Sequence, residues 1–226
     1  MTNTLHRFGK PDTLRDDYIV FAMAAKGIND DGAAAKVQTF FRTALKYDPI
    51  NMGNAVINPL YRPEKNLTFL KLYFSGRHEK VAPETFIAEV AALGTAAVVF
   101  GNRGAMGGFL KELQDLDLGL SVNVSALVDD VREVCGEIHL TPHSVEYSLP
   151  FAGDLERLPE RDILSLTTMC GHGMIAANFA RKMVDGVREG RFGHDQACQY
   201  MAKFCVCGVF NTTRAMRILE AAGSGT

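Results

Sequence analysis

The chain has 226 residues, of which 47% are hydrophobic and 22% charged, and its formal net charge is −2. This is enough apolar sequence for one large domain with a buried core, or for a domain with an appended subdomain. The basic residues are scattered and form no stripe for a phosphate backbone, so we expect no nucleic-acid partner. No apolar run approaches the roughly 20 residues of a membrane helix, and the polar N-terminus has no signal-peptide core. We therefore expect a cytoplasmic protein without membrane contact.

The first part of the chain predicts two helices and a loop. Residues 14–26 suit a helix, because Thr13 can cap it and the acidic pair Asp16-Asp17 suits the positive end of its dipole. A second helix is expected over residues 30–45, with its apolar side chains on one side. Residues 49–66 are rich in Pro and Asn, which is typical of a surface loop.

Residues 67–150 alternate between strand and helix patterns. Strands are expected at 67–74, 95–100, 118–125 and 144–149, and helices at 83–93, 108–117 and 126–139. Such alternation is typical of a mostly parallel sheet with right-handed crossovers. We therefore predict an α/β fold in which this alternating, mostly parallel sheet follows the two N-terminal helices and precedes a C-terminal helical segment that carries cysteines.

The composition changes after Gly153. A charged stretch that contains Pro159 is typical of a linker, and residues 162–169 predict a last strand or a short helix. Helical patterns then follow at 173–189, 194–204 and 211–222. We place a boundary here, with the N-terminal helices and the α/β body in residues 1–153 and a helical, metal-binding segment in residues 154–226. The two can also form one continuous domain.

Two short motifs in the helical segment suggest its chemistry. Cys-Gly-His-Gly-Met contains Cys170 and His172, and Phe-Cys-Val-Cys-Gly contains Cys205 and Cys207. Both motifs fall at expected helix starts, where backbone N–H groups and the helix dipole stabilise anionic sulfur. If the intervening helices fold back, three thiolates and an imidazole meet at one point. Cys198 is expected to be a core residue and is the reserve ligand.

Three interpretations of these motifs stay open. The first is an iron–sulfur cluster of the four-iron type, held by Cys170, Cys205 and Cys207, with one iron open to His172 or to a substrate. The second is a zinc ion held by all four side chains. The third is a metal-free set of buried thiols, with Cys170 as a nucleophile at a helix start. The odd number of cysteines, five, disfavours a disulfide framework.

A glycine-rich turn at residues 101–108 follows an apolar strand and precedes a helix. Its backbone N–H groups could hold an anion with Arg103 as counter-charge, and Asn102, Gly104 and Ser125 would share that edge of the sheet. The alternative is a tight turn that needs glycine for close packing.

Together these features favour an iron–sulfur enzyme that acts on a small anionic metabolite. It would be a lyase or hydratase, or an oxidoreductase, with His172 as acid or base. The alternatives are a structural-zinc binding or scaffold module, and a metal-free enzyme with Cys170 as nucleophile. The sequence leaves a homo-oligomer open.

Overall fold

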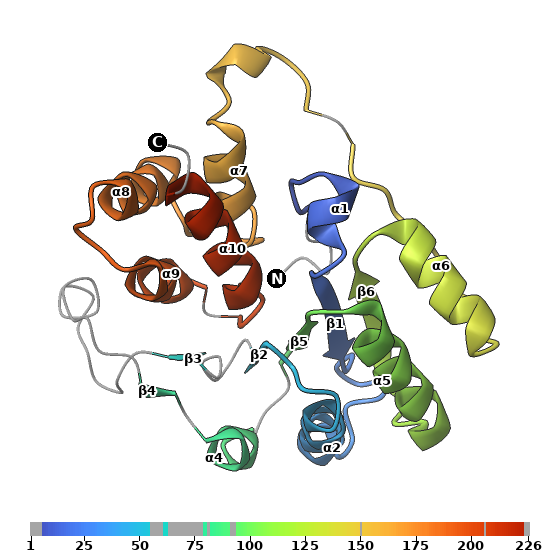
Figure 1. Cartoon of the computed structure of the whole chain (residues 1–226). Coiled ribbons are helices and arrows are strands. Elements are labelled where there is room, and N and C mark those ends of the chain that lie inside the picture. Colours follow the sequence, from blue (N-terminus) through green and yellow to red (C-terminus); the bar gives the residue numbers. More distant parts are fainter. Residues whose placement is uncertain are drawn as a thin grey trace.

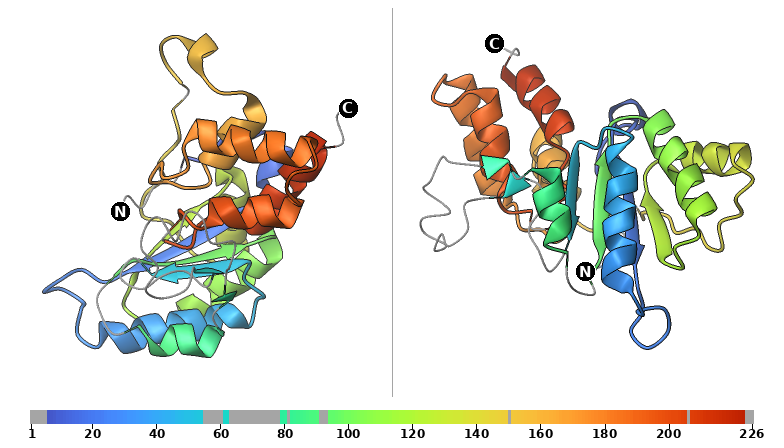
Figure 2. Two further views of the ribbon diagram at one scale, coloured as in Figure 1. Left: turned by 90° about the vertical axis from the view of Figure 1, so that its left-hand side faces the viewer. Right: turned by 90° about the horizontal axis from the view of Figure 1, so that it is seen from below.

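A computed structural model describes residues 6–54, 61–62, 79–80, 82–90, 94–149, 151–205 and 207–223. Within these ranges the protein has a four-stranded antiparallel sheet with helices on both faces (Figures 1 and 2). Its strands are β1 (Tyr18–Met23), β2 (Asn51–Asn54), β5 (Ala96–Phe100) and β6 (Ser121–Ser125), in the order β2-β5-β1-β6. Strands β3 (Tyr61–Arg62) and β4 (Glu79–Lys80) form a separate two-stranded sheet.

The helices divide between the two faces of the four-stranded sheet. One face packs against α2 (Ala33–Leu45), α4 (Pro83–Ala88), α5 (Arg103–Leu116) and α6 (Val128–Glu137). The other packs against α7 (Arg161–Thr167), α8 (Ala177–Arg188), α9 (His194–Ala202) and α10 (Thr212–Gly223). Two short helices, α1 (Pro11–Leu14) and the 3-10 helix η1 (Leu155–Arg157), lie outside these layers. No helix in the described ranges has both the length and the apolar character needed to cross a membrane.

The strand β1 falls where the sequence predicted a helix over residues 14–26, and that prediction is wrong. Residues 18–22 are at most 1% exposed, because β1 has a strand on each side and helices on both faces. Ile19 and Phe21 contribute to one core, whereas Val20 contributes to the other. A run that is apolar at every position has no period, so periodicity cannot distinguish a buried strand from a buried helix.

The predicted mostly parallel sheet is also wrong, because every pairing in the four-stranded sheet is antiparallel. Strands β5 and β6, joined by α5, both run antiparallel to β1 and therefore run in the same direction as each other. They are not neighbours, however: Val20 of β1 lies opposite Val98 of β5 on one side and Val124 of β6 on the other. Strand β1, from early in the chain, thus lies between β5 and β6, the two strands that the alternating strand and helix pattern predicted to be parallel neighbours.

Several other predictions can be compared with the structure. Residues 144–149, expected to form a strand, are extended but belong to no sheet, and the expected loop at 49–66 contains β2. The strand expected at 67–74 lies outside the described residues. Residues 161–167 form a helix, α7, and the three helices expected after it correspond to α8, α9 and α10. The division into residues 1–153 and 154–226 stays a prediction.

Candidate metal site

The two cysteine motifs lie in loops on the same face of the sheet. Cys170 and His172 are in the loop between α7 and α8, and Cys205 and Cys207 are in the loop between α9 and α10. Helices α8, α9 and α10 pack against one another, so the chain folds back and brings the second loop to the first. The three cysteines are at most 3% exposed, whereas His172 is exposed.

Three of the four side chains are in direct contact, and the fourth, Cys170, is a close neighbour of Cys205. Cys205 Sγ lies 3.8 Å from Cys207 Sγ, and Cys207 Sγ lies 3.5 Å from His172 Nδ1. Cys170 lies close enough to Cys205 for each thiol to shift the pKa of the other. The structure therefore brings together the four residues that the sequence singled out, in the order Cys170, Cys205, Cys207, His172.

Hydrogen bonding within this series makes the outer two thiols more acidic. A hydrogen bond with Cys205 lowers the pKa of Cys170 to about 6 and that of Cys207 to about 6. The same two hydrogen bonds, with burial, raise the pKa of Cys205 well above its usual value. Backbone groups of His172 and Met174 also hydrogen-bond to the Cys170 sulfur, which favours its thiolate. A thiol has one proton, so Cys205 can stabilise only one neighbouring thiolate at a time.

The two distances match those between ligands of one tetrahedral metal ion. With Zn–S bonds of about 2.3 Å and Zn–N bonds of about 2.0 Å, two thiolates lie about 3.8 Å apart, and a thiolate and an imidazole nitrogen about 3.5 Å. Thiolates that bind different irons of a cluster lie further apart, because the iron–iron separation is added. Within the described part of the chain, no group of three or more His, Cys, Asp or Glu side chains already stands in the geometry of a complete metal site. The pair distances thus fit one ion, but closing the site requires side-chain rotation.

The second cysteine loop packs directly on strand β2. Gly53 lies so close to the backbone of Cys207 and Gly208 that a Cβ atom at Gly53 would overlap the Cys207 carbonyl group. Gly208 has φ of +71°, a left-handed conformation that favours glycine. This backbone contact sets how closely the second cysteine loop packs on strand β2.

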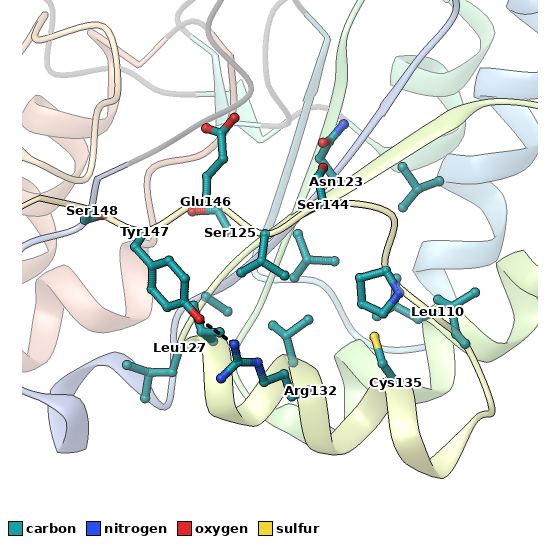
Figure 3. A pocket seen from close by; sticks show the side chains of 18 of the residues that line it. Leu110, Asn123, Ser125, Leu127, Arg132, Cys135, Ser144, Glu146, Tyr147 and Ser148 are labelled. Atoms are coloured by element: carbon teal, nitrogen blue, oxygen red, sulfur yellow. Dashed lines mark hydrogen bonds between the residues drawn. The ribbon is translucent and has the colours of Figure 1, made fainter.

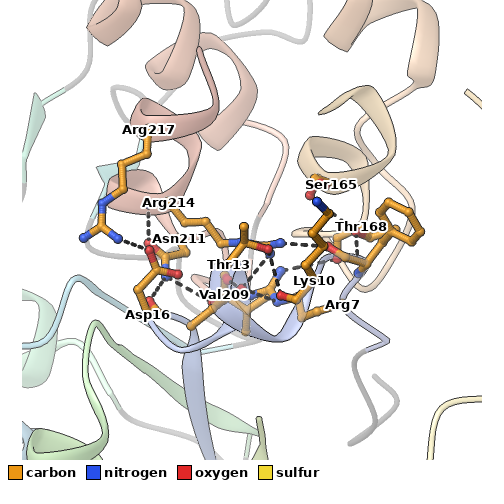
Figure 4. Close-up of polar contacts among 12 residues, drawn as sticks. Arg7, Lys10, Thr13, Asp16, Ser165, Thr168, Val209, Asn211, Arg214 and Arg217 are labelled. Carbon is orange, nitrogen blue, oxygen red and sulfur yellow. Dashed lines mark hydrogen bonds and ion pairs between the residues drawn. The ribbon is translucent and has the colours of Figure 1, made fainter. Parts of the chain in front are cut away.

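A buried ionic network joins the two cysteine-bearing segments (Figure 4). The guanidinium group of Arg7 donates to the carbonyl oxygen of Thr168, at 3.3 Å, and to that of Val209. Each acceptor lies two residues from a cysteine of the site. Asp17 holds this arrangement through Arg7 Nε at 3.1 Å and through the Arg214 guanidinium at 3.0 Å. Arg7 therefore sets the separation of the two segments that carry the thiols.

Asn211 connects this network to the start of α10. Its side-chain amide donates to the backbone carbonyl of Asp16 at 2.8 Å and to Asp17 at 3.1 Å. Its side-chain oxygen accepts the backbone N–H of Arg214 at 2.9 Å and so caps the helix. From the sequence, Asp17 was expected only to favour the first turn of a helix, and Arg7 had no expected role. Asp17 and Arg214 are 197 residues apart, and local patterns do not show such a pair.

The glycine-rich turn expected to hold an anion is the start of α5. Asn102 caps this helix, since its side-chain oxygen accepts the backbone N–H of Ala105 at 2.8 Å. Arg103 pairs with two carboxylates of α6, Glu133 at 3.3 Å and Glu137. The positive charge of Arg103 is thus already balanced within the protein.

The remaining predicted residues also lie away from the thiols. Gly104 is inside α5, which covers the opposite face of the sheet, and Ser125 ends the outer strand β6. The reserve ligand Cys198 is buried in α9, and its thiol donates to the carbonyl oxygen of Thr212 at 3.5 Å. The structure therefore brings none of the predicted anion-binding residues to the cysteine site.

Comparison with known proteins adds no assignment. No protein-family model matches this chain, no curated protein matches it, and no solved structure matches it. The function therefore has to be argued from the chemistry of the site.

Proposed function

We propose that this protein binds one metal ion through Cys170, Cys205, Cys207 and His172, and that the ion is zinc. The observation that carries the proposal is the pair of distances, 3.8 Å between two sulfur atoms and 3.5 Å between sulfur and imidazole nitrogen. Three thiolates and one imidazole are an established zinc ligand set. Such an ion would fasten the loop before α8 to the loop before α10 and so stabilise this side of the molecule.

The surroundings of the thiols support a negatively charged ligand set. Zinc with three thiolates and a neutral imidazole carries one negative charge. In the neighbouring network, Arg7 and Arg214 share Asp17, which leaves one buried positive charge next to the second cysteine loop. The charge of a metal complex is therefore balanced close to where it would form.

An iron–sulfur enzyme is the second candidate, with lyase or oxidoreductase chemistry. It is favoured by the backbone hydrogen bonds to the sulfurs of Cys170 and Cys207, a common feature of cluster ligands. It requires Cys205 and Cys207 to separate if they bind different irons. In this case His172, the exposed member of the set, would be the acid or base beside an open iron.

A metal-free thiol enzyme is the third candidate, because the pKa of Cys170 is lowered to about 6. For all three candidates we propose a reducing compartment such as the cytoplasm, which would keep the free thiols reduced. The small anionic metabolite expected from the sequence stays a proposal without a binding residue, since Arg103 lies on the other face of the sheet and is paired there.

The test is anaerobic purification followed by metal analysis, acid-labile sulfide analysis and an absorption spectrum. We expect a colourless protein with one zinc per chain, which is lost in Cys205→Ser. Cys198→Ser is the matched control, because Cys198 is equally buried on the neighbouring helix and lies outside the series of contacts. It should keep its zinc.

Other outcomes of this measurement would contradict the zinc proposal. Iron, sulfide and visible absorption that are lost in Cys205→Ser would establish the second candidate. A protein without metal in which Cys170 is alkylated rapidly at neutral pH would favour the third, since a ligated thiolate reacts slowly.

A further inference from the structure

Strand β6 is an outer strand of the sheet, and a cavity lies beside it. In the sheet, β6 pairs with β1 on one edge and with no described strand on the other. A cavity of about 940 Å³ separates that edge and helix α6 from residues 140–148 (Figure 3). We call this cavity the β6 groove, and we call residues 144–149, which form its outer wall, the outer segment. The groove is thus bounded on both sides by extended backbone.

The groove is large enough for a short strand. A paired strand residue occupies about 160 Å³, from a rise of about 3.3 Å, a strand spacing of about 4.8 Å and a face-to-face spacing of about 10 Å. A cavity of about 940 Å³ therefore has room for several strand residues. Strand β6 has five residues, and the outer segment has six.

The two sides of the groove differ in polarity. Toward the helices it is lined by apolar side chains, among them Leu110 of α5 and Leu127 and Cys135 next to or within α6 (Figure 3). On the opposite side it is lined by polar side chains, including Asn123 of β6 and Glu146 of the outer segment. A strand that fits this groove has apolar and polar residues in alternation.

The outer segment, Ser-Val-Glu-Tyr-Ser-Leu, has this alternation itself. Its apolar side chains are poorly covered, with Val145 45%, Tyr147 57% and Leu149 86% exposed. Residues 141–149 make no backbone-to-backbone hydrogen bond with another described residue. Two side-chain hydrogen bonds hold the segment in place, one between Ser148 and His6 at 2.7 Å and one from Arg132 to the Tyr147 hydroxyl. The segment therefore has the alternating sequence of a strand, but it belongs to no sheet and lacks a partner strand among the described residues.

We propose that the β6 groove binds the outer segment of a second copy of this chain. A two-fold axis perpendicular to the sheet would place the two outer segments antiparallel and side by side. Each would then pair with β6 of the other copy on one edge and with its symmetry mate on the other. The order across the dimer is β6, partner outer segment, own outer segment, partner β6.

This arrangement accounts for the gap in each chain. The outer segment is separated from its own β6 by the cavity, and in the dimer the strand of the partner occupies that space. Pairing also covers Val145 and Tyr147, removes the exposed edge of β6 and keeps the sheet antiparallel. A single surface patch supplies both halves of the contact, as closed two-fold dimers require.

The first test is the mass of the purified full chain by light scattering and sedimentation velocity at several concentrations. We expect a dimer of twice 24.7 kDa. Val145→Glu should weaken the association by at least about 100-fold, because it places carboxylates in an apolar, symmetric contact. Ile28→Glu is the matched control: Ile28 is 85% exposed on a loop outside the groove, and this variant should stay dimeric. Both variants should keep the circular dichroism spectrum of the wild type.

The second test examines the geometry of the contact and does not depend on a destabilising change. Glu146→Cys should form a covalent dimer with a short bismaleimide, since Glu146 lies near the middle of the outer segment and would approach its own symmetry mate. Ile28→Cys should not, and the five native cysteines are buried. A monomer at all concentrations would overturn the proposal and leave the groove to a strand of another protein. A dimer that survives Val145→Glu, or that Glu146→Cys cannot cross-link, would also overturn it.

Discussion

The two faces of the sheet have cores of different chemistry. On the face of α2, α4, α5 and α6, aromatic rings dominate, and Phe109 contacts Phe40 and Phe100 with ring centroids 5.1 Å apart in both pairs. On the face of α7 to α10 the core contains four of the five cysteines, together with methionines and alanines. The first core contains no cysteine and is built around aromatic rings, whereas the second combines cysteines, methionines and alanines with larger apolar residues such as Phe21 and Phe210, beside a buried ionic network.

This difference shows where the molecule can respond to a ligand. Aromatic burial stabilises the first face by removing a large apolar area from water, and no further component is needed. The second face depends on Asp17 and its two arginine partners and on the contact between Gly53 and the second cysteine loop. A metal ion would therefore add stability to the second face and leave the first unchanged.

The largest effect is expected from a cavity in the aromatic core. Phe109→Ala removes a fully buried ring, so we expect the free energy of unfolding to fall by about 3–5 kcal/mol in urea titration. Metal content per folded chain should not change. Leu116→Ala, at a residue 42% exposed at the end of the same helix, is the control and should cost less than about 0.5 kcal/mol. Loss of metal from folded Phe109→Ala would show that the two faces are coupled.

A smaller but more informative effect is expected from the ionic network. Asp17→Asn leaves Arg7 and Arg214 buried without a carboxylate and should cost about 3 kcal/mol, the low end of the usual range, because the amide oxygen still accepts a hydrogen bond. Metal affinity should fall as well, since Arg7 positions both cysteine segments. The neighbouring Asp16→Asn affects a pair with the exposed Arg217 and should change stability by less than about 1 kcal/mol. Equal effects of the two substitutions would contradict the assigned role of the network.

The smallest effect is expected at the rim of the aromatic face. Hydrogen bonds from Lys46 and then from Tyr47 hold the pKa of Glu112 below its usual value. A lowered pKa in the folded state stabilises the protein above the unfolded pKa of about 4.3, and this contribution is lost as the pH falls through the folded value. Urea midpoints of the wild type and Glu112→Gln should therefore differ slightly at pH 7 and converge in acid. A difference that is the same at both pH values would contradict this assignment.

Much of the candidate site was accessible from the sequence. The motifs around Cys170 and Cys205 stand out because closely spaced cysteine and histidine residues flanked by glycine are typical of metal or cluster ligands. The sequence also predicted that both motifs lie just before helices. Apolar residues recur in α8 and α10 with the spacing of one helix face, so both helices could be predicted from the sequence. That the two loops meet did not follow from these patterns, because it depends on how α8, α9 and α10 pack.

The glycines at the start of α5 show a second feature that the sequence could not decide. Residues 101–108 suggested an anion-binding turn, with close packing as the alternative. In the structure, a Cβ atom at Gly108 would overlap the ring of Tyr47, and one at Gly107 would press on Val134 of α6. These glycines therefore permit close packing, and only the positions of the neighbouring side chains distinguish this role from anion binding.

The amino-acid sequence alone identified the apolar residues, most of the helices and strands from Ala96 onward except at residues 144–149, and a set of side chains of the kinds that bind metals. It does not establish the partners of each strand. Strand β1 is flanked by β5 and β6, and Asp17 meets Arg214, through contacts between segments about 80 to 200 residues apart. Local periodicity reports the burial of each segment, but the energy of strand pairing and of a buried ion pair depends on residues that are distant in the chain. Strand order, strand direction and the assembly of the thiol site were therefore set by tertiary packing.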